Sequence, residues 1–291
     1  MIDLHMHSNF SDGSMSPAEL VGHAKQLGLK AIALTDHDTI DGVGEFVEAG
    51  EKYNILTVPG VEISVDTSLP NNGHLHMLGL FIDYKSSGLR NTLDFLRNER
   101  NLRAKKIINK LNELDVPITM LELLREAGEG SIGRPHVAKI LVRKGIVSSI
   151  QEAFDVYLAK GKPAYMDKVK LGEVDAIKMI KDAGGLAILA HPHLMKFDSF
   201  EEIRAKILEL RTLGLDGLEI YYSSMPMEMT KKLLRMVMEM DFVISGGSDF
   251  HGLNKDNIKL GSGLGDLHIQ DEVYYQLKRR WHSKNQKVAV T

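Results

Sequence analysis

The histidine and acidic side chains that could carry chemistry begin within the first fourteen residues, MIDLHMHSNFSDGS. Apolar and polar residues alternate here, so on a β-strand His5 and His7 would project from the same face. Two imidazoles placed two residues apart on one strand face can hold a metal ion between them. A polar turn after the strand would bring the carboxylate of Asp12 back toward them. Taken alone, the pattern fits equally well an amphipathic edge strand whose histidines face water.

Similar polar groups recur at or near the ends of most expected strands. They contain imidazoles and carboxylates but no thiol, a donor set that suits Mn²⁺, Zn²⁺ or Fe²⁺. A tetrahedral zinc needs only four ligands, so the groups are numerous enough for two or three ions, with a carboxylate such as Glu62 as a bridge. The groups are His5, His7 and Asp12; Asp36, His37 and Asp38; Glu62; His74 and His76; His191 and His193; and Asp249 and His251.

Some of these side chains have an ordinary structural explanation. Turn or helix-cap roles explain Asp36 and Asp38 at least as well as metal ligation does, and Asp249 can cap the turn that follows two glycines. The remaining histidines, His23, His268 and His282, fall outside the groups and are expected to face solvent.

Hydrophobic patterning predicts about seven buried strands that alternate with helices. The strands are expected at residues 2–7, 30–35, 55–60, 74–83, 186–190, 217–221 and 242–245, and a charged helix is expected at 271–281. Between about residues 88 and 160 the sequence shows helices and no convincing strand. Such alternation allows an open doubly wound sheet or a closed barrel. Because polar groups follow almost every strand, and because the strand ends of a barrel converge on one site, the barrel is favoured.

Composition limits the class of protein. The chain has 291 residues, a formal net charge of −3 and no cysteine, which excludes disulfides, thiolate metal sites and a cysteine nucleophile. Because it contains no apolar run of about 20 residues and its N-terminus lacks the pattern of a signal peptide, we expect a cytoplasmic protein that does not enter a membrane. Walker-A, dinucleotide-binding and G-x-S-x-G motifs are also absent, so nothing supports ATP, NAD or a serine nucleophile.

Six motifs together resemble the PHP (polymerase and histidinol phosphatase) family. They are DLHMHSNFSDG, LTDHDT, GVEIS, the histidine before LGLFID, AHPH and GSDFH, and they follow one another in order within residues 1–85 and 184–252. The resemblance implies a distorted seven-stranded (β/α)7 barrel that holds two to three divalent ions, Mn²⁺ first and Zn²⁺, Fe²⁺ or Mg²⁺ as alternatives. As a ligand, His76 is preferred to His74 because it directly precedes the strand residues Met77-Leu78-Gly79. The implied metal ligands are His5, His7, Asp12, His37, Glu62, His76, His191, Asp249 and His251, of which His37, Asp249 and His251 are also expected to act in catalysis.

The helical region resembles one branch of this family, the TrpH-like phosphoesterases. Its segments GRPH (133–136) and YLAKGKPAY (157–165) carry the likeness, which implies that Arg134 and His136 contact a phosphate. A guanidinium presents a planar fork that fits two phosphate oxygens. His193 departs from the small residue more usual after His-Pro in this branch, and we expect it to contact substrate or to face solvent. We therefore expect a barrel at residues 1–88 and 161–291, with a helical insertion (a cap) at 89–160.

The expected activity is metal-assisted hydrolysis of a phosphomonoester of a nucleotide, AMP or a 3′,5′-nucleotide bisphosphate. Three alternatives are a 5′-3′ exonuclease on short RNA or DNA, a histidinol-phosphate phosphatase, and a metal-binding regulatory module without catalysis. The expected partner is thus a small phosphorylated substrate or a short oligonucleotide, and no obligate protein partner is inferred.

Overall fold

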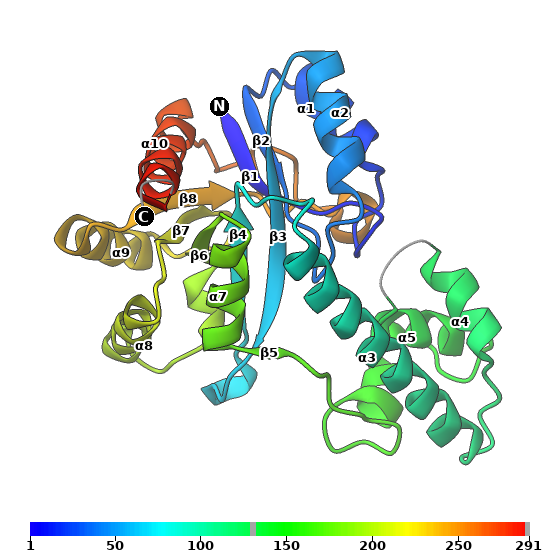
Figure 1. The fold of residues 1–291 in the computed structure, drawn as a ribbon. Coiled ribbons are helices and arrows are strands. Elements are labelled where there is room, and N and C mark those ends of the chain that lie inside the picture. The colour runs from blue at the N-terminus through cyan, green and yellow to red at the C-terminus, as the bar shows by residue number, and fades with distance from the viewer. Residues whose placement is uncertain (129–131, 289–291) are drawn as a thin grey trace. The chain divides into compact units, whose positions relative to one another are not determined.

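A computed structural model describes residues 1–128 and 132–288 of the chain. The chain divides into two compact units, the first made of residues 1–91 and 170–291 and the second of residues 92–169. Most elements of both are labelled in Figure 1.

Seven strands of the first unit form a mixed sheet that is nearly closed into a barrel, as predicted. The sheet closes where the residues after β8 meet β1: Met6 bridges Phe250, and the His7 N–H donates to the Phe250 carbonyl at 2.9 Å. A further strand of two residues, β5 (Leu171–Gly172), was not predicted and pairs with β3. In spatial order the seven strands are β1 (Ile2–Met6), β2 (Ala31–Leu34), β3 (Leu56–Asp66), β4 (Leu75–Leu80), β6 (Leu186–Leu189), β7 (Gly217–Tyr222) and β8 (Val243–Gly247).

One strand departs from the expected βα alternation. β3 is longer than predicted and β4 is shorter, and β4 runs antiparallel to both of its neighbours, β3 and β6. Because β4 returns along β3 without a crossover helix, its first residues lie at the barrel end where the parallel strands finish. His76, which pairs with Ser64 near the end of β3, is thereby brought to the same end as His5 and His7.

Helices cover the outside of the barrel, and capping residues in the sequence mark the start of the first one. Ser16 and Glu19 form the capping box of α1 (Pro17–Gln26), with a proline in its first turn. The tail helix α10 (Asp271–Val288) extends beyond its predicted end and buries Leu277 against the strands, and Trp281 Nε1 donates to the Gly184 carbonyl at 2.8 Å. The other helices of this unit are α2 (Val43–Tyr53), α7 (Glu173–Asp182), α8 (Phe200–Thr212) and α9 (Met227–Met240).

The second unit is helical and has its own hydrophobic core. α3 (Ser87–Asn112) enters it from the first unit, and α4 (Met120–Ala127), α5 (Arg134–Arg143), α6 (Ile150–Ala153) and a π-helical turn (Phe154–Leu158) follow. Its core includes Leu111, Leu123 and Leu141, all fully buried. None of the described residues 92–128 and 132–169 forms a strand, in agreement with the sequence pattern.

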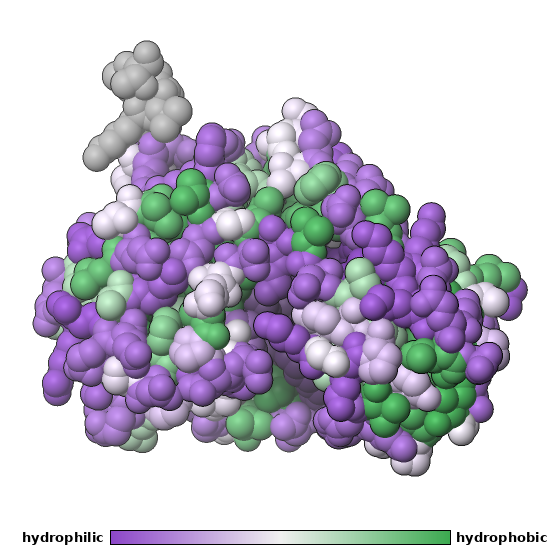
Figure 2. Space-filling view, turned by 90° about the horizontal axis from the view of Figure 1, so that it is seen from below, coloured by the Kyte–Doolittle hydropathy of each residue, from purple (hydrophilic) through white to green (hydrophobic). Residues whose placement is uncertain are grey.

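The described helices include none that combines the length and apolarity needed to cross a membrane. The face of the molecule in Figure 2 is mostly hydrophilic, with hydrophobic residues gathered only in small patches.

Candidate metal centre

His5 and His7 lie on one face of β1 and are fully buried, while Leu4 and Met6 between and beside them fill the apolar core. The Nε2 atoms of both imidazoles lie 3.3 Å from Glu62 Oε2. They also lie 3.4 and 3.1 Å from Asp249 Oδ1, respectively. These four side chains, from β1, β3 and the turn after β8, form a first group whose donor atoms are close enough to hold one ion.

A second group surrounds Asp12, in the turn after β1. His251 Nε2 lies 3.2 Å and His7 Nδ1 lies 3.6 Å from Asp12 Oδ1. His37 Nε2 lies 3.9 Å from Asp12 Oδ2. Together these residues place four donors within reach of one ion, and the first and second groups meet at His7.

Glu62 links the remaining imidazoles. Its Oε1 lies 2.7 Å from His76 Nδ1 and 3.0 Å from His191 Nε2. Its Oε2, which faces His5 and His7, also lies 3.0 Å from His37 Nδ1. One fully buried carboxylate therefore contacts five imidazoles, and its two oxygens face different groups, as expected of a bridging ligand. All nine ligands expected from the sequence are brought together at this end of the barrel.

The donor atoms fit divalent metal ions. His5 Nε2, His7 Nε2 and Glu62 Oε2 are buried and have no hydrogen-bond partner among the described residues, and the same holds for His37 Nδ1 and His251 Nε2. Polar atoms buried without a partner are costly and rare. A set of such atoms that converges from four strands or strand ends, with nitrogen and oxygen donors and no sulfur, suits two or three divalent ions. The donors leave the identity of the ion open.

Electrostatics within the centre prepares the carboxylates for ligation. Burial alone would raise the pKa of Glu62, but the surrounding imidazoles, above all His37 and His76, hold it well below its ordinary value. The pKa of Asp249 is likewise lowered, against its burial, by His5 and His7. The two carboxylates are therefore ionised at neutral pH, the form in which carboxylates bind metals.

Two of the expected ligands have a backbone conformation that L-residues rarely adopt. His191 has a φ of 28° and Asp249 a φ of 59°. Such conformations cost on the order of 1–3 kcal/mol and persist only where the surroundings fix them. Here the His191 N–H donates to Glu219 Oε2 at 2.7 Å and the Asp249 N–H donates to the His5 carbonyl at 2.9 Å. The fold therefore fixes an unfavourable backbone in order to aim these two side chains.

Glu219 of β7 is a site residue that the sequence analysis missed. It is fully buried, and its Oε1 accepts a hydrogen bond from His5 Nδ1 at 2.8 Å. A carboxylate that accepts a hydrogen bond from Nδ1–H fixes the imidazole tautomer and leaves Nε2 to face the ion. The available signal was an acidic residue inside an otherwise apolar strand, GLEIYY.

Three buried aspartates hold the turns that carry the ligands. Asp36 accepts hydrogen bonds from both the N–H (2.7 Å) and the hydroxyl (2.6 Å) of Ser8. Asp38 does the same with Ser64, at 2.9 and 3.1 Å, and Asp3 with Ser248, at 2.9 and 2.6 Å. Each bonded serine is next to or two residues from a ligand: Ser8 follows His7, Ser64 follows Glu62 and Ser248 precedes Asp249. Asp36 and Asp38 therefore stabilise turns, the structural explanation considered from the sequence.

The other expected substrate-binding residues lie in two places. His193 is near the mouth of the centre: its Nε2 lies 3.0 Å from Ser224 Oγ, and its ring centroid lies 5.3 Å from that of Tyr222. Tyr222 donates its hydroxyl to Asp249 Oδ2 at 2.9 Å. Arg134 and His136 belong to the second unit, at the start of α5.

Arg134 is fixed within the second unit by three contacts. Its guanidinium carbon lies 5.6 Å from the centroid of the Phe154 ring and 5.3 Å from that of Tyr165. Its Nη1 donates to the Leu158 carbonyl at 3.0 Å. His136 Nδ1 accepts a hydrogen bond from the Gly133 N–H at 3.1 Å. The Arg134 side chain is thus held in one orientation by the segment that resembled the TrpH-like branch.

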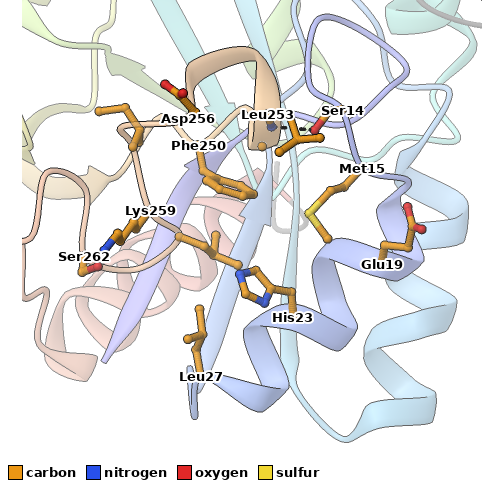
Figure 3. Close-up of a pocket in the computed structure, with 13 residues that line it drawn as sticks. Ser14, Met15, Glu19, His23, Leu27, Phe250, Leu253, Asp256, Lys259 and Ser262 are labelled. Atoms are coloured by element: carbon orange, nitrogen blue, oxygen red, sulfur yellow. Dashed lines mark hydrogen bonds between the residues drawn. The ribbon is translucent and has the colours of Figure 1, made fainter.

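A pocket of about 460 Å³ lies behind the two turns that carry Asp12 and His251. Phe250 and His23 of α1 both line it, with ring centroids 6.2 Å apart (Figure 3). Ser14 lines the pocket, and its hydroxyl accepts a hydrogen bond from the Leu253 N–H at 2.8 Å. Gly252 packs so closely against Ser14 that a Cβ there would lie 2.1 Å from the Ser14 hydroxyl oxygen. The pocket is therefore lined by residues that lie one or two positions after Asp12 and His251 in the sequence.

Comparisons with known proteins agree with this site. The PHP domain family matches residues 3–212. A 5′-3′ exoribonuclease of Haemophilus influenzae is 35% identical over 250 residues, which cover 86% of this chain and 89% of the relative. A 3′,5′-nucleoside bisphosphate phosphatase of Chromobacterium violaceum is 32% identical over 252 residues, which cover 86% and 87%.

Solved structures show the same likeness over nearly the whole chain. One is a protein of Bifidobacterium adolescentis described as a metal-dependent phosphoesterase, with a TM-score of 0.80 and 30% identity over 96% of both chains. Another is an amidohydrolase of Chromobacterium violaceum with bound sulfate and no metal, with a TM-score of 0.77, 30% identity and the same coverage.

A nearly closed barrel with converging imidazoles and carboxylates, together with these relatives, defines a metal-dependent phosphoesterase, a hydrolase that acts on phosphoric ester bonds. It is an enzyme, and the alternative of a metal-binding module without catalysis fits these findings no better. The chain belongs to the PHP domain family. Asp249 and His251 lie beyond the matched residues and join the site because the barrel closes between β8 and β1.

Proposed function

We propose that the enzyme hydrolyses the phosphomonoester of a nucleotide, AMP or a 3′,5′-nucleotide bisphosphate. The observation that carries this proposal is the arrangement around Glu62, where buried donors from four strands or strand ends suit two or three divalent ions. The bisphosphate phosphatase of Chromobacterium violaceum supports the choice of substrate. Bound ions would lower the pKa of a water molecule toward neutrality and neutralise the phosphoryl oxygens.

The residues divide into holders of ions and contacts to substrate. We assign one ion to His5, His7, Glu62 and Asp249, a second to Asp12, His37 and His251, and a third to Glu62, His76 and His191. His37, Asp249 and His251 are also assigned to catalysis, in contact with the reacting phosphate or the attacking water. Mn²⁺ is our first choice of ion, and the cytoplasm is our choice of compartment, because a chain without cysteine suits a reducing environment.

Two donors bonded to Oδ2 orient the Asp249 carboxylate for metal binding and catalysis. Tyr222 donates to its Oδ2, and Lys255 Nζ lies 2.8 Å from the same oxygen. With Oδ2 taken by these two donors, Oδ1 is left toward His5 and His7. Lys255 also places a positive charge beside the centre, which favours an anionic substrate.

We assign binding of the substrate phosphate to Arg134, His136 and His193, and a cap role to the helical insertion. The aromatic rings beside Arg134 and the Leu158 carbonyl leave part of its guanidinium fork to other partners. A pre-oriented fork loses little entropy when it binds a phosphate through two hydrogen bonds.

A second candidate is a 5′-3′ exonuclease that acts on short RNA by the same chemistry. It is favoured by the Haemophilus influenzae relative, whose length the match covers to 89%. Histidinol phosphate is supported by none of the relatives named above.

One comparison of substrates tests the proposal. The enzyme is freed of metal with a chelator, reloaded with Mn²⁺ and offered AMP, adenosine 3′,5′-bisphosphate and a 5′-phosphorylated RNA tetranucleotide. We expect the highest kcat/KM on one of the two mononucleotides, with release of inorganic phosphate. Preference for the tetranucleotide, with release of 5′-mononucleotides, would establish the exonuclease instead. No hydrolysis with any divalent ion would refute both candidates.

A further inference from the structure

His74 belongs to a group of imidazoles that the nine expected ligands do not include. The sequence favoured His76 over His74 as the metal ligand, but two residues that lie two positions apart on an extended segment project to the same side. In the structure the ring centroids of His74 and His76 are 5.0 Å apart, and His191 completes a triangle at 5.7 Å and 5.2 Å. One nitrogen from each of the three rings lies within 4.8 Å of the others.

Backbone contacts hold this triangle together. The His74 N–H donates to the Leu194 carbonyl at 3.0 Å, and the Ala190 N–H donates to the His76 carbonyl at 3.1 Å. The segment before β4 and the segment after β6 are thereby joined on both sides of His191. The proximity of the three rings follows from the packing of two chain segments.

The approach of these two segments depends on a glycine. A Cβ on Gly73 would lie 2.0 Å from the Met195 carbonyl oxygen, so no larger residue fits without displacing the backbone. Asn71 adds a side-chain hydrogen bond from its Nδ2 to the Lys196 carbonyl at 3.0 Å. His74 is thus positioned by the residues that precede it in the sequence.

His191 has a second nitrogen available to this group. Its Nε2 faces Glu62, while its Nδ1 is buried and has no hydrogen-bond partner among the described residues. The whole residue is only 3% exposed. A buried imidazole nitrogen without a partner is costly unless an ion or a donor completes it.

We propose that His74 is a metal ligand and that, with His76 and His191, it holds one divalent ion through imidazole nitrogens. Three imidazoles beside a carboxylate form a donor set richer in nitrogen than the Asp12 group. Such a set favours Zn²⁺ or Fe²⁺ over Mn²⁺ and Mg²⁺, which prefer oxygen donors. The centre then has unequal positions, one with a preference for a nitrogen-binding ion. The inference extends the proposed metal centre and does not depend on which substrate is hydrolysed.

The test measures metal binding in the absence of substrate. Metal-free wild-type protein and the variants His74→Ala and His74→Phe are titrated with Zn²⁺ and with Mn²⁺ in competition with a chromogenic chelator. Bound metal is then counted after gel filtration. His74→Phe keeps an aromatic ring at this half-buried position and removes both nitrogens, so it separates lost ligation from lost packing. His268→Ala, an exposed histidine outside the centre, is the matched control.

We expect both His74 variants to lose one bound Zn²⁺, or to bind it at least about tenfold more weakly, while Mn²⁺ binding to the other positions changes little. The visible spectrum of the Co²⁺-loaded protein should also change, because one imidazole leaves the coordination sphere. His268→Ala should match the wild type. Equal Zn²⁺ stoichiometry, affinity within twofold and an unchanged Co²⁺ spectrum in a folded His74 variant would overturn the proposal. Because substrate is absent from every measurement, failure here is distinct from failure of the proposed activity.

Discussion

Glu219 Oε1 lies 2.8 Å from His5 Nδ1, and both side chains are fully buried. The other oxygen of Glu219 accepts the backbone N–H of His191 at 2.7 Å. One carboxylate from β7 therefore orients a ligand on β1 and the strained backbone of a ligand after β6. No charged partner from lysine or arginine is needed, because the hydrogen bonds of the imidazole and the amide stabilise the carboxylate.

Replacing Glu219 should weaken metal binding without unfolding the protein. Glu219→Gln keeps the shape of the side chain but removes its charge, and it presents an amide N–H₂ to one of two donors. We expect the affinity of the ion beside His5 to fall by about 10–100-fold, the usual cost of losing an oriented partner of a ligand. Chelator competition measures the affinity, and circular dichroism checks the fold. Asp216→Asn, a buried carboxylate just before β7 that accepts the Ala187 N–H, is the control. Equal affinity of Glu219→Gln and wild type would contradict this role.

The sequence predicted the barrel and the group of imidazoles and carboxylates at its end, because both depend on local patterns. Apolar runs marked the strands, and a histidine or carboxylate near their ends marked the site. The place of β4 was predicted, but the sequence carries no signal for its direction, since periodicity of two is the same for a strand read in either sense. His76 was selected from its motif, and its position beside Glu62 depends on the antiparallel return of β4.

The residues that orient the ligands could not be recognised in the same way. Glu219 and Asp3 are acidic residues within strands, and their partners His5 and Ser248, respectively, lie more than 200 residues away in the sequence. Only the closing of the barrel brings them to those partners. The left-handed backbone of His191 is equally invisible, because histidine in that conformation is set by tertiary contacts.

The turn after β1 should depend on Asp36 for stability. Besides both groups of Ser8, Asp36 accepts the Ser11 hydroxyl at 2.5 Å, so three donors converge on a buried carboxylate. Asp36→Asn would place an amide N–H₂ among them. We expect the free energy of unfolding, measured by urea denaturation of metal-free protein, to fall by about 1–3 kcal/mol. The exposed Asp182→Asn, which loses only an ion pair with Lys178, should change it by less than about 0.5 kcal/mol. A similar small change in both variants would argue against the role of Asp36.

Gly252, which follows His251, allows a close contact with Ser14, two residues after Asp12. In Gly252→Ala a Cβ would clash with the Ser14 hydroxyl, and the residue has a φ of 62°. Gly265 also has a positive φ, 101°, but a Cβ added there would meet no atom within 4 Å, so Gly265→Ala isolates the backbone cost of roughly 1–2 kcal/mol. We expect Gly252→Ala to displace the turn that carries Asp12 and to weaken metal binding at least about tenfold more than Gly265→Ala. Metal titration of both variants measures the difference, and equal affinities would rule out the contact between Gly252 and Ser14 as a support of the centre.

Removing the metal should lower thermal stability as well as activity. Binding to the folded state alone stabilises a protein by about 2.7 kcal/mol when the free ion is at 100 times its Kd. We expect EDTA, followed by its removal, to lower the Tm of the barrel transition by several degrees, because the imidazoles and carboxylates around Glu62 then lack a common partner. Added Mn²⁺ or Zn²⁺ should restore the Tm in calorimetry. In a His5→Ala variant the same treatment should shift the Tm less. If the Tm of the wild type does not change on chelation, this would count against a metal centre in the folded enzyme.

Arg134 offers the sharpest test of phosphate recognition in the second unit. Its guanidinium is held beside Phe154 and Tyr165 and bonded to the Leu158 carbonyl, an orientation that a flexible lysine ammonium would not reproduce. We expect Arg134→Ala to lower kcat/KM on phosphomonoesters by a factor that corresponds to about 1–3 kcal/mol of transition-state stabilisation, the contribution of a hydrogen bond to a charged group. Arg134→Lys should recover only part of this loss. Metal content should stay unchanged, which separates this effect from that of a lost ligand.

Arg143→Ala is the matched control for that experiment, because Arg143 lies on the same helix, is exposed and pairs with Glu126. Its kinetics should equal those of the wild type. The guanidinium fork is matched to two anionic oxygens. If Arg134 holds the phosphate, Arg134→Ala and the wild type should therefore have the same kcat/KM on a neutral ester of similar size. Unchanged kinetics in Arg134→Ala on every phosphomonoester would reject the assignment and leave substrate recognition to the groups at the barrel mouth, His193 and Lys255.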